Sequence, residues 1–369
     1  MPHLLPLTLA LLIAAALCLA VPATEAAQAR PHVQIRGIYG GMPEEINGQS
    51  LREFGVNAIF TGERTITAAK LAALHAQGVQ VFAEFPTVHN DAYVKAHPES
   101  APVDATGRPA PPPEGWQGVC PTHAGFRQAR MDRARDLLAE HAIDGLWLDY
   151  HHAHASWERA EPILPDSCFC QRCLTRFQRA TGVTLPDADT PTRAALLLGE
   201  LNGQWVQWRC DVLTDWVREL REIIDDVRPG ALLGTYHCPW SDTDRDGAMK
   251  RKLHIDLRAQ AKYVDVFSTM PYHARFGHGD DPDWVRRQVQ WLGAYLGIEG
   301  KPGERHRIWP IVQASDWGEA VTPAAVRQVL EAGTAPPSTG VMVFRWGTLP
   351  NEPEKLQVLG EFYRLIAAP

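Results

Sequence analysis

The sequence has no low-complexity segment and no large excess of one charge. Its 36 Lys and Arg residues stand against 43 Asp and Glu residues, for a net charge of −7 over 369 residues. A protein that holds nucleic acid or an acidic membrane surface through its charge carries a basic field instead. The composition therefore favours neither of these partners, and it is apolar enough for a globular protein with a real core.

Lys and Arg are also absent from the first 29 residues, whose only acidic residue is Glu25. This segment contains a long apolar run and ends in Ala27-Gln28-Ala29, a small-x-small pattern typical of signal peptidase sites. We therefore expect residues 1–29 to be a secretory signal peptide and the mature protein to lie in the periplasm or outside the cell. A retained membrane anchor is the alternative; after cleavage we expect no stable insertion into a membrane.

Beyond this segment, eight short runs rich in β-branched and aromatic residues alternate with stretches that carry a 3.6-residue apolar stripe. The runs lie at 33–41, 56–63, 79–86, 143–150, 232–240, 264–272, 308–317 and 340–347. Eight strands alternating with helices in a chain of this length predict an α/β fold, a (β/α)8 TIM barrel over residues 30–369. Long connections follow the third and fourth predicted strands, and in such barrels these loops build the active face.

Three cysteines stand within six residues in the stretch CFCQRC, which begins at Cys168. Cys168 and Cys170 are too close for an easy mutual disulfide, and three thiols cannot all pair among themselves. In the predicted barrel, Cys120 follows the third strand and the cluster up to Cys173 follows the fourth, so the fold brings them to neighbouring loops. Four thiolates suit a closed structural zinc site that braces long loops. The alternative is a disulfide from Cys120, because an exported protein meets an oxidising compartment.

These motifs resemble known families. Cys120-Pro121-Thr122 followed by CFCQRC resembles the four-cysteine zinc arrangement of family 42 β-galactosidases, and the stretch at 201–230 resembles the helix that follows in that family. Residues 140–350 are still more similar to a set of uncharacterised bacterial glycoside-hydrolase-like barrels. Those pair DG-x-W-x-D-[YF] with LPD-x-CFC and end in IVQA-x-D followed by GVMVFRW. The resemblance implies the barrel and the zinc site.

One departure from family 42 concerns the chemistry. Those enzymes carry Asn-Glu at the end of strand four, with the Glu as acid/base. The corresponding strand here ends in Leu148-Asp149-Tyr150-His151. The family's mechanism therefore does not carry over to this chain.

Glycoside hydrolysis usually needs two carboxyl groups, one to protonate the leaving oxygen and one to attack or to activate water. The barrel model places Glu63, Glu84, Asp149 and Asp316 at the carboxyl ends of strands. Asp149 closes the apolar run GLWLD, where a charge has little structural purpose, and we assign it as nucleophile or base. We assign Asp316 as the acid, with Glu84 as its substitute, and Glu63 as a contact to substrate. Each of them has a structural alternative, as a hydrogen-bonding residue of a loop.

Aromatic and polar side chains gather at the same predicted rim. Aromatic faces suit the apolar C–H faces of sugar rings, although any one ring can instead pack under a loop. The aromatic set is Tyr150, Trp157, Tyr236, Trp240, Tyr272, Trp317 and Trp346. The expected polar contacts to substrate are His151, His237, Gln313 and Arg345, and Arg345 has an internal salt bridge as its alternative.

Together these features predict a secreted enzyme that cleaves glycosidic bonds of an oligo- or polysaccharide by a two-carboxylate mechanism. Two alternatives stay open. A barrel without hydrolytic activity would keep the cleft as a carbohydrate-binding site. The run from Asp149 to His154, with His151 and His152, instead suits a metal-dependent amidase or deacetylase, although neighbouring residues on a strand point opposite ways.

Overall fold

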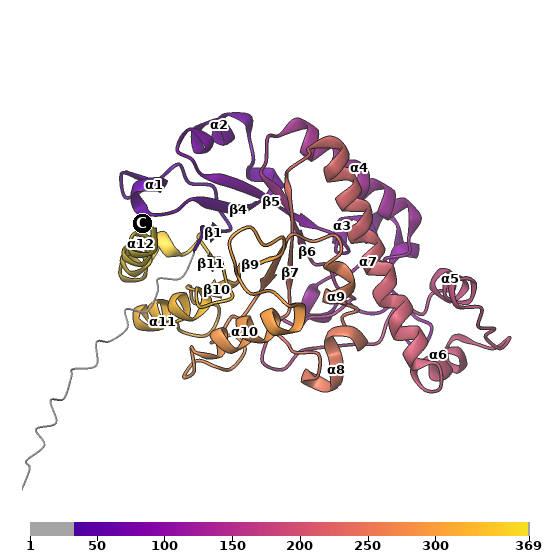
Figure 1. Cartoon of the computed structure of the whole chain (residues 1–369). Helices are drawn as coiled ribbons and strands as arrows, with labels where there is room; N and C mark the ends of the chain where they lie inside the picture. Colours follow the sequence, from indigo (N-terminus) through magenta and orange to yellow (C-terminus); the bar gives the residue numbers. More distant parts are fainter. Residues whose placement is uncertain (1–32, 368–369) are drawn as a thin grey trace, which may run out of the picture. The chain divides into compact units, whose positions relative to one another are not determined.

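The computed structural model describes residues 33–367 (Figure 1). The predicted signal peptide lies outside the described residues. Within them, no helix combines the length and the apolar character that a membrane crossing requires.

The centre of the molecule is one parallel sheet. Its order is β10-β11-β1-β4-β5-β6-β7-β8-β9, and a separate hairpin joins β2 to β3. The strands are β1 (Ile35–Tyr39), β2 (Glu45–Ile46), β3 (Gln49–Ser50), β4 (Ala58–Gly62), β5 (Gln80–Pro86), β6 (Gly145–Asp149), β7 (Leu232–His237), β8 (Val266–Thr269), β9 (Arg307–Ile308), β10 (Ile311–Gln313) and β11 (Gly340–Phe344).

The two ends of this sheet are parts of one interrupted strand, because only Trp309 and Pro310 separate β9 from β10. The Trp309 amide donates to the Phe267 carbonyl in β8 (3.1 Å), and the Pro310 carbonyl accepts from the Met342 amide in β11 (3.0 Å). The segment thus pairs with β8 on one side and β11 on the other, and the ring closes. The (β/α)8 barrel predicted from the sequence is confirmed.

Helices surround the strands (Figure 1). They begin where the apolar stripes begin; Thr322, for example, caps α11 by accepting a hydrogen bond from the Ala325 amide (3.1 Å). The α-helices are α1 (Leu51–Phe54), α2 (Ala68–Ala76), α3 (Asp91–Ala96), α4 (Ala124–Glu140), α5 (Gln171–Thr181), α6 (Thr190–Leu198), α7 (Asn202–Val227), α8 (Asp244–Arg251), α9 (Leu257–Gln260), α10 (Trp284–Leu296), α11 (Pro323–Gly333) and α12 (Pro353–Ala367). Short 3-10 turns are η1 (Glu63–Thr65), η2 (Pro98–Ser100), η3 (Pro113–Gly115) and η4 (Leu349–Asn351).

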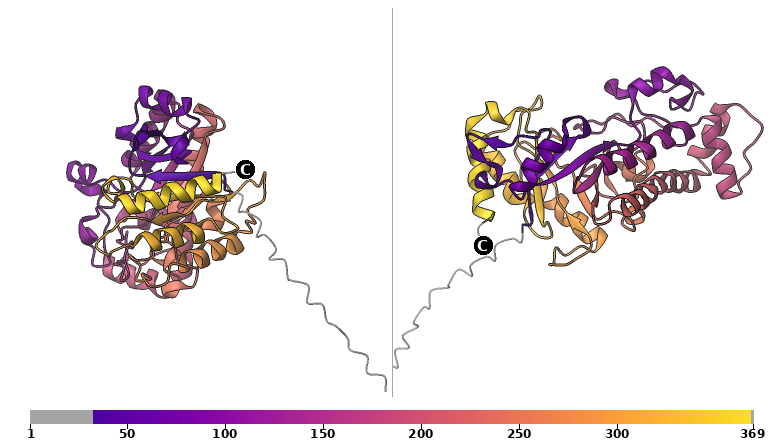
Figure 2. Two further views of the ribbon diagram at one scale, coloured as in Figure 1. Left: turned by 90° about the vertical axis from the view of Figure 1, so that its left-hand side faces the viewer. Right: turned by 90° about the horizontal axis from the view of Figure 1, so that it is seen from above.

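Two helices extend the molecule beyond the barrel. Helices α5 and α6 lie at one end, against α7 (Figures 1 and 2). They cover a second apolar cluster, which includes Phe169, Phe177, Trp205 and Trp208 together with cysteine side chains. The long insertion after β6 therefore carries a small core of its own.

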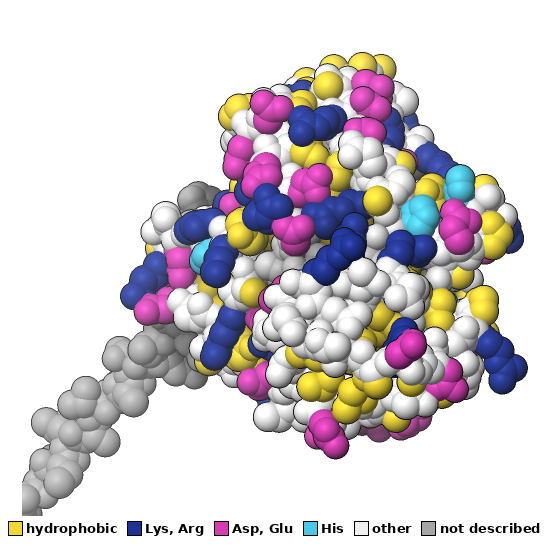
Figure 3. Space-filling model, turned by 90° about the vertical axis from the view of Figure 1, so that its right-hand side faces the viewer, with side chains coloured by type: hydrophobic (Ala, Val, Ile, Leu, Met, Phe, Trp, Pro, Cys, Tyr) yellow, Lys and Arg dark blue, Asp and Glu magenta, His cyan; other side chains and the backbone are white. Residues whose placement is uncertain are grey.

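The charged side chains are distributed without a dominant sign. On the face shown in Figure 3, Lys and Arg side chains lie among Asp and Glu side chains.

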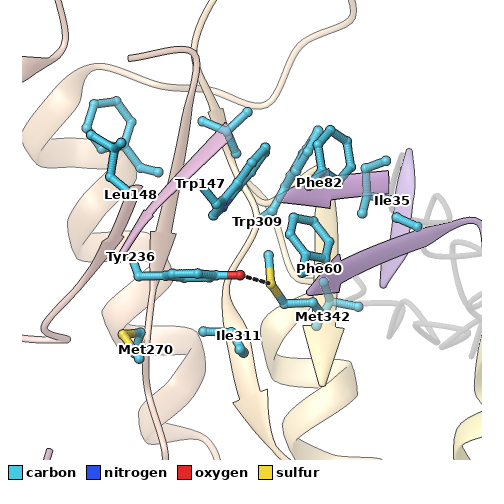
Figure 4. Packing of buried hydrophobic residues seen from close by; sticks show 14 of the residues in the cluster. Ile35, Phe60, Phe82, Trp147, Leu148, Tyr236, Met270, Trp309, Ile311 and Met342 are labelled. Carbon is cyan, nitrogen blue, oxygen red and sulfur yellow. Dashed lines mark hydrogen bonds between the residues drawn. The ribbon is translucent and has the colours of Figure 1, made fainter. Parts of the chain in front are cut away.

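Large aromatic rings fill the inside of the barrel (Figure 4). Trp147 of β6 stacks on Trp309 with ring centroids 5.6 Å apart, and Phe82 of β5 stacks on Phe60 of β4 at 4.8 Å. A side chain at Gly234 in β7 would overlap the Trp147 ring, so this position requires glycine. The rings close the barrel below its carboxyl end, where the loops begin.

Candidate active site

A pocket of about 640 Å³, including its open mouth, lies at the carboxyl ends of the strands. Its walls come mainly from the loops after β5 and β6, as expected for the long connections of a barrel. The side chain of Tyr236 from β7 contributes as well, and Arg275 and Trp317 line the opposite side. Three acidic residues line it: Glu114, Asp149 and Glu158.

Asp149 lies where the sequence predicted, at the last position of β6. Glu84 of β5 pairs in register with Trp147, two residues before Asp149, so both carboxyl groups are on the inner face of neighbouring strands. The Tyr39 hydroxyl donates to Glu84 Oε2 (2.9 Å), and the Tyr150 amide donates to Asp149 Oδ1 (2.8 Å). Burial first, and then the nearby Glu84 and Glu158, raise the pKa of Asp149 well above its usual range.

Glu158 is the acidic residue that sequence reasoning missed. It lies in the loop after β6, in the stretch ASWERAEP, which shows neither a strand end nor a motif. Burial raises the pKa of Glu158 to about 7, although the Arg275 guanidinium opposes the shift and Glu84 adds to it. The Arg275 Nε donates to the Glu158 backbone carbonyl (2.8 Å), which fixes the two residues relative to each other. A carboxyl group that titrates near neutral pH is suited to proton transfer.

The raised pKa of Glu158 has a measurable effect on stability. In the unfolded chain the pKa of the Glu158 carboxyl group is about 4.3. Because this group ionises in the unfolded chain only above that pH, folding carries a penalty for its charge only there. The penalty is absent below pH ~4.5, grows as the pH rises, and is complete above the folded pKa of about 7. We expect Glu158→Gln to stabilise the protein by about 2 kcal/mol at pH 8 and hardly at all at pH 4.5.

Thermal unfolding at both pH values tests this expectation. Glu161→Gln is the matched control, because Glu161 is exposed in the same loop. Equal shifts of Tm at the two pH values, or no shift at pH 8, would contradict the assignment.

Aromatic rings form the walls of the pocket. Tyr150 follows Asp149 directly and adopts a positive φ of 47°, a strained conformation for a tyrosine that the structure holds in place. The Thr87 hydroxyl donates to the Asp149 and Tyr150 carbonyls (3.1 and 3.2 Å), which secures this turn. Trp157, Tyr236 and Trp317 complete the set of predicted aromatic residues that line the pocket.

The histidines that follow Asp149 are engaged in hydrogen bonds to the protein. His151 contacts the Thr87 hydroxyl and the Leu213 carbonyl, both at 3.1 Å. His154 accepts from the Gly118 amide (3.1 Å), and its Nε2 lies 2.9 Å from the Pro111 carbonyl. Burial lowers the pKa of His151 to about 4 and that of His154 below its usual value, so both stay neutral. Neither has a free ring nitrogen for a catalytic metal.

The structure does not bring Asp316 to the pocket. Strand β10 ends at Gln313, and the Asp316 carboxylate instead pairs with Lys355 of α12 (2.7 Å) and accepts from the Val321 amide (2.9 Å). These hydrogen bonds lower the pKa of Asp316. An ionised, half-exposed carboxylate outside the pocket does not fit the role of proton donor, and Glu158 replaces it in the assignment below.

Glu63 also lies outside the pocket. It belongs to η1 and pairs with Arg133 of α4 (3.1 Å), which is a structural role.

The other predicted substrate contacts are buried behind the pocket wall or lie beside it. None of them is among the residues that line the pocket. Gln313 accepts from the Arg275 amide (3.0 Å) and so supports a residue that does line it. Tyr272 packs on Trp317 (5.7 Å), and Trp240 packs on Trp157 (6.2 Å). The remaining predicted substrate contacts are His237, Arg345 and Trp346. The Nδ1 atom of His237 lies 2.9 Å from the Cys238 carbonyl, and Arg345 and Trp346 follow β11.

The four cysteines meet between the two long loops. Their sulfur atoms all lie within 4.8 Å of one another, and Cys120 Sγ is 3.6 Å from both Cys170 Sγ and Cys173 Sγ. A tetrahedral zinc with Zn–S bonds of 2.3 Å separates its sulfurs by about 3.8 Å. The Val103 amide also donates to Cys168 Sγ (3.2 Å), as amides do toward thiolate ligands. The donor set therefore fits a metal ion with four thiolates.

Two arginines lie next to this cluster. The thiolates of Cys120 and Cys170 raise the pKa of Arg172 despite the opposing effect of its partial burial. Arg209 is buried near Cys173 and stacks on the Trp205 ring at 5.2 Å. Their positive charges offset the net negative charge of a four-thiolate site.

The barrel is similar to solved structures of glycoside hydrolases. The glycoside hydrolase domain of PgaB (BpsB) from Bordetella bronchiseptica matches with a TM-score of 0.63 at 15% identity, over 84% of this chain and 89% of that chain. The β-galactosidase from the psychrophilic Marinomonas ef1 matches with a TM-score of 0.61 at 13% identity, over 89% and 58%. Gan42B, a GH42 β-galactosidase from G. stearothermophilus, matches with a TM-score of 0.57 at 14% identity, over 86% and 53%.

Neither a protein-family model nor a curated protein matches the chain. The chain spans little more than half the length of the two β-galactosidases. At these identities the likeness shows the fold, a barrel shared with glycoside hydrolases. The chemistry has to be argued from the pocket.

Proposed function

We propose that the protein is a glycoside hydrolase that cleaves a glycosidic bond with two carboxyl groups, Asp149 and Glu158. The observation that carries the proposal is that both residues line one aromatic-walled pocket at the carboxyl end of the barrel, with pKa values raised by burial. Enzymes of this kind use carboxyl groups whose environments hold one of them protonated near neutral pH. The predicted signal peptide supports a location in the periplasm or outside the cell.

Glu158 is the proton donor in this mechanism. Its pKa of about 7 keeps a large fraction protonated at neutral pH and makes the proton easy to transfer. It gives that proton to the glycosidic oxygen as the bond to the anomeric carbon breaks. The Arg275 guanidinium then stabilises the carboxylate that remains.

Asp149 acts on the opposite side of the bond, as nucleophile or as base toward a water molecule. Burial, and then the nearby carboxyl groups of Glu84 and Glu158, raise the pKa of Asp149. Glu84 accepts a hydrogen bond from the Tyr39 hydroxyl and lies beside Asp149 on the neighbouring strand. Glu84 is therefore a positioning residue behind Asp149 rather than the acid.

A structural zinc ion held by Cys120, Cys168, Cys170 and Cys173 is the second part of the proposal. Four sulfur ligands leave no open position for substrate, so the ion would tie the loops after β5 and β6 together. The same loops carry the pocket walls, and the cluster thereby supports the site indirectly.

The two other functions considered have less support. A metal-dependent amidase or deacetylase needs several free ligands beside Asp149. His151 and His154 use both ring nitrogens in hydrogen bonds, and His152 uses Nδ1, which leaves too few histidine ligands for a catalytic ion. A barrel that only binds carbohydrate has no need for carboxyl groups with strongly raised pKa values. The test is a screen of aryl glycosides and polysaccharides with purified wild-type protein; binding without cleavage across the panel would favour the binding protein.

The pH dependence of kcat/KM reports on Glu158 directly. Because the donor must be protonated, activity should fall as the pH rises above about 7. The Arg275 charge lowers the pKa of Glu158, so Arg275→Gln should move this alkaline limb to higher pH. Arg275→Lys keeps the charge and is the matched control, with an expected limb close to that of the wild type. If the alkaline limb of the pH profile of kcat/KM does not move in Arg275→Gln, then Glu158 is not the proton donor.

A further inference from the structure

Trp116 stands apart from the other large aromatic residues. Its side chain is 38% exposed, and within residues 33–367 the only other exposed large hydrophobic residues are Ile163 and Leu365. Single exposed apolar residues are common on protein surfaces and need no explanation. Trp116, however, lines the same pocket as Asp149 and Glu158.

A continuous row of rings leads from Trp116 into the pocket. The Trp116 ring lies 5.3 Å from the Tyr150 ring, Tyr150 lies 6.4 Å from His152, and His152 lies 5.8 Å from Trp157. His89 supports the outer end, since its ring stacks on Tyr150 at 4.7 Å. Exposure falls along the row, because Trp157 is only 4% exposed. The inner end of the row is therefore next in sequence to Glu158.

The loop that carries Trp116 is fixed to the loop after β6. Glu114 accepts a hydrogen bond from the Ser156 hydroxyl (2.6 Å) and forms an ion pair with Arg159. On the other side of Trp116, the Gly118 amide donates to His154 (3.1 Å). An exposed ring held in this way is already placed for a ligand, so binding loses little conformational entropy.

We infer that Trp116 is the outer sugar-binding position of an extended cleft, in which a ring of an oligosaccharide stacks on the indole while the bond to be cut lies at Asp149 and Glu158. The inference rests on the proposed function and adds a substrate class, a glycan bound across several sugar units rather than a monosaccharide derivative. Neutral side chains dominate this wall, because burial lowers the pKa values of His89 and His154 and to about 4 that of His152. The uncharged rings of this wall thus suit the apolar face of a sugar.

Binding to an inactive variant tests the inference separately from catalysis. Cellohexaose, xylohexaose and chitohexaose are titrated by calorimetry into Asp149→Asn, alone and combined with Trp116→Ala or Trp116→Phe. We expect at least one hexasaccharide to bind, Trp116→Ala to weaken that binding about ten-fold, and Trp116→Phe to restore most of it. Ile163→Ala is the control, because Ile163 is exposed in the neighbouring loop but does not line the pocket.

Turnover gives the second measurement. In the otherwise wild-type protein, Trp116→Ala should raise KM for the oligosaccharide more than KM for a small aryl glycoside, whereas Ile163→Ala should change neither. Binding that is insensitive to Trp116→Ala, or no binding of any of the three hexasaccharides, overturns the inference. Retention of hydrolysis by Asp149→Asn would instead overturn the proposed mechanism and leave the Trp116 result standing.

Discussion

Replacement of Asp149 by asparagine should lower kcat for glycan cleavage by about 10³-fold or more, because the amide can neither attack the anomeric carbon nor take a proton from water. The side chain keeps its shape, so the protein should still bind the glycan. Activity measurements and calorimetry on the same preparation check both parts. Asp316→Asn is the matched control, since Asp316 pairs with Lys355 outside the pocket and its loss should leave kcat unchanged.

Glu158→Gln distinguishes the proton donor from the nucleophile or base. Without a proton donor, glycosides with poor leaving groups should lose about 10²-fold or more in kcat, whereas activated nitrophenyl glycosides, which leave unaided, should lose far less. Asp149→Asn should impair both classes alike. Equal losses for both substrates in Glu158→Gln, or unimpaired turnover in Asp149→Asn, would reject the assignment.

Loss of the metal ligands should have the largest effect on stability. We expect one zinc per chain by metal analysis, and we expect Cys173→Ser to lose it and to lower the free energy of unfolding by about 3 kcal/mol or more. The apolar cluster around Phe169 and Trp205 depends on the same loops. Hydrogen exchange should therefore increase chiefly in α5, α6 and the loop near Val103, while the barrel strands stay protected.

A second buried cysteine provides the control. Cys210 lies inside α7, away from the four-sulfur group, so Cys210→Ala should keep the full metal content. Chelation of the wild type should lower stability as we expect for Cys173→Ser, without an immediate block of turnover. Instant inhibition by the chelator that metal reverses would point to a catalytic ion instead.

The barrel was readable from the sequence because each strand is a short apolar run between helices with clear periodic stripes. The run 308–317 also contains Pro310. A proline interrupts a strand because it lacks the amide that a central strand position needs. In the structure, Pro310 separates β9 from β10 at that point. The convergence of Cys120 with the cluster at 168–173 followed from the barrel itself, which makes the loops after adjacent strands neighbours.

The candidate active site could be predicted from the sequence only in part. Asp149 was visible because it ends an apolar strand, and Glu84 because it lies on the adjacent one. Glu158 gave no signal, since its pocket position depends on how an irregular loop folds back over the barrel. The prediction for Asp316 failed for a related reason, because Asp316 lies three residues beyond the end of β10 and its carboxylate pairs with Lys355 of α12.

The stacked rings of Trp147, Trp309, Phe82 and Phe60 determine where a ligand can enter and leave the barrel. They occupy the axis with side chains that solvent does not reach, so nothing passes from one end of the barrel to the other. In the proposed mechanism, substrate and products therefore enter and leave at the carboxyl end of the barrel, where Trp116 lines the pocket.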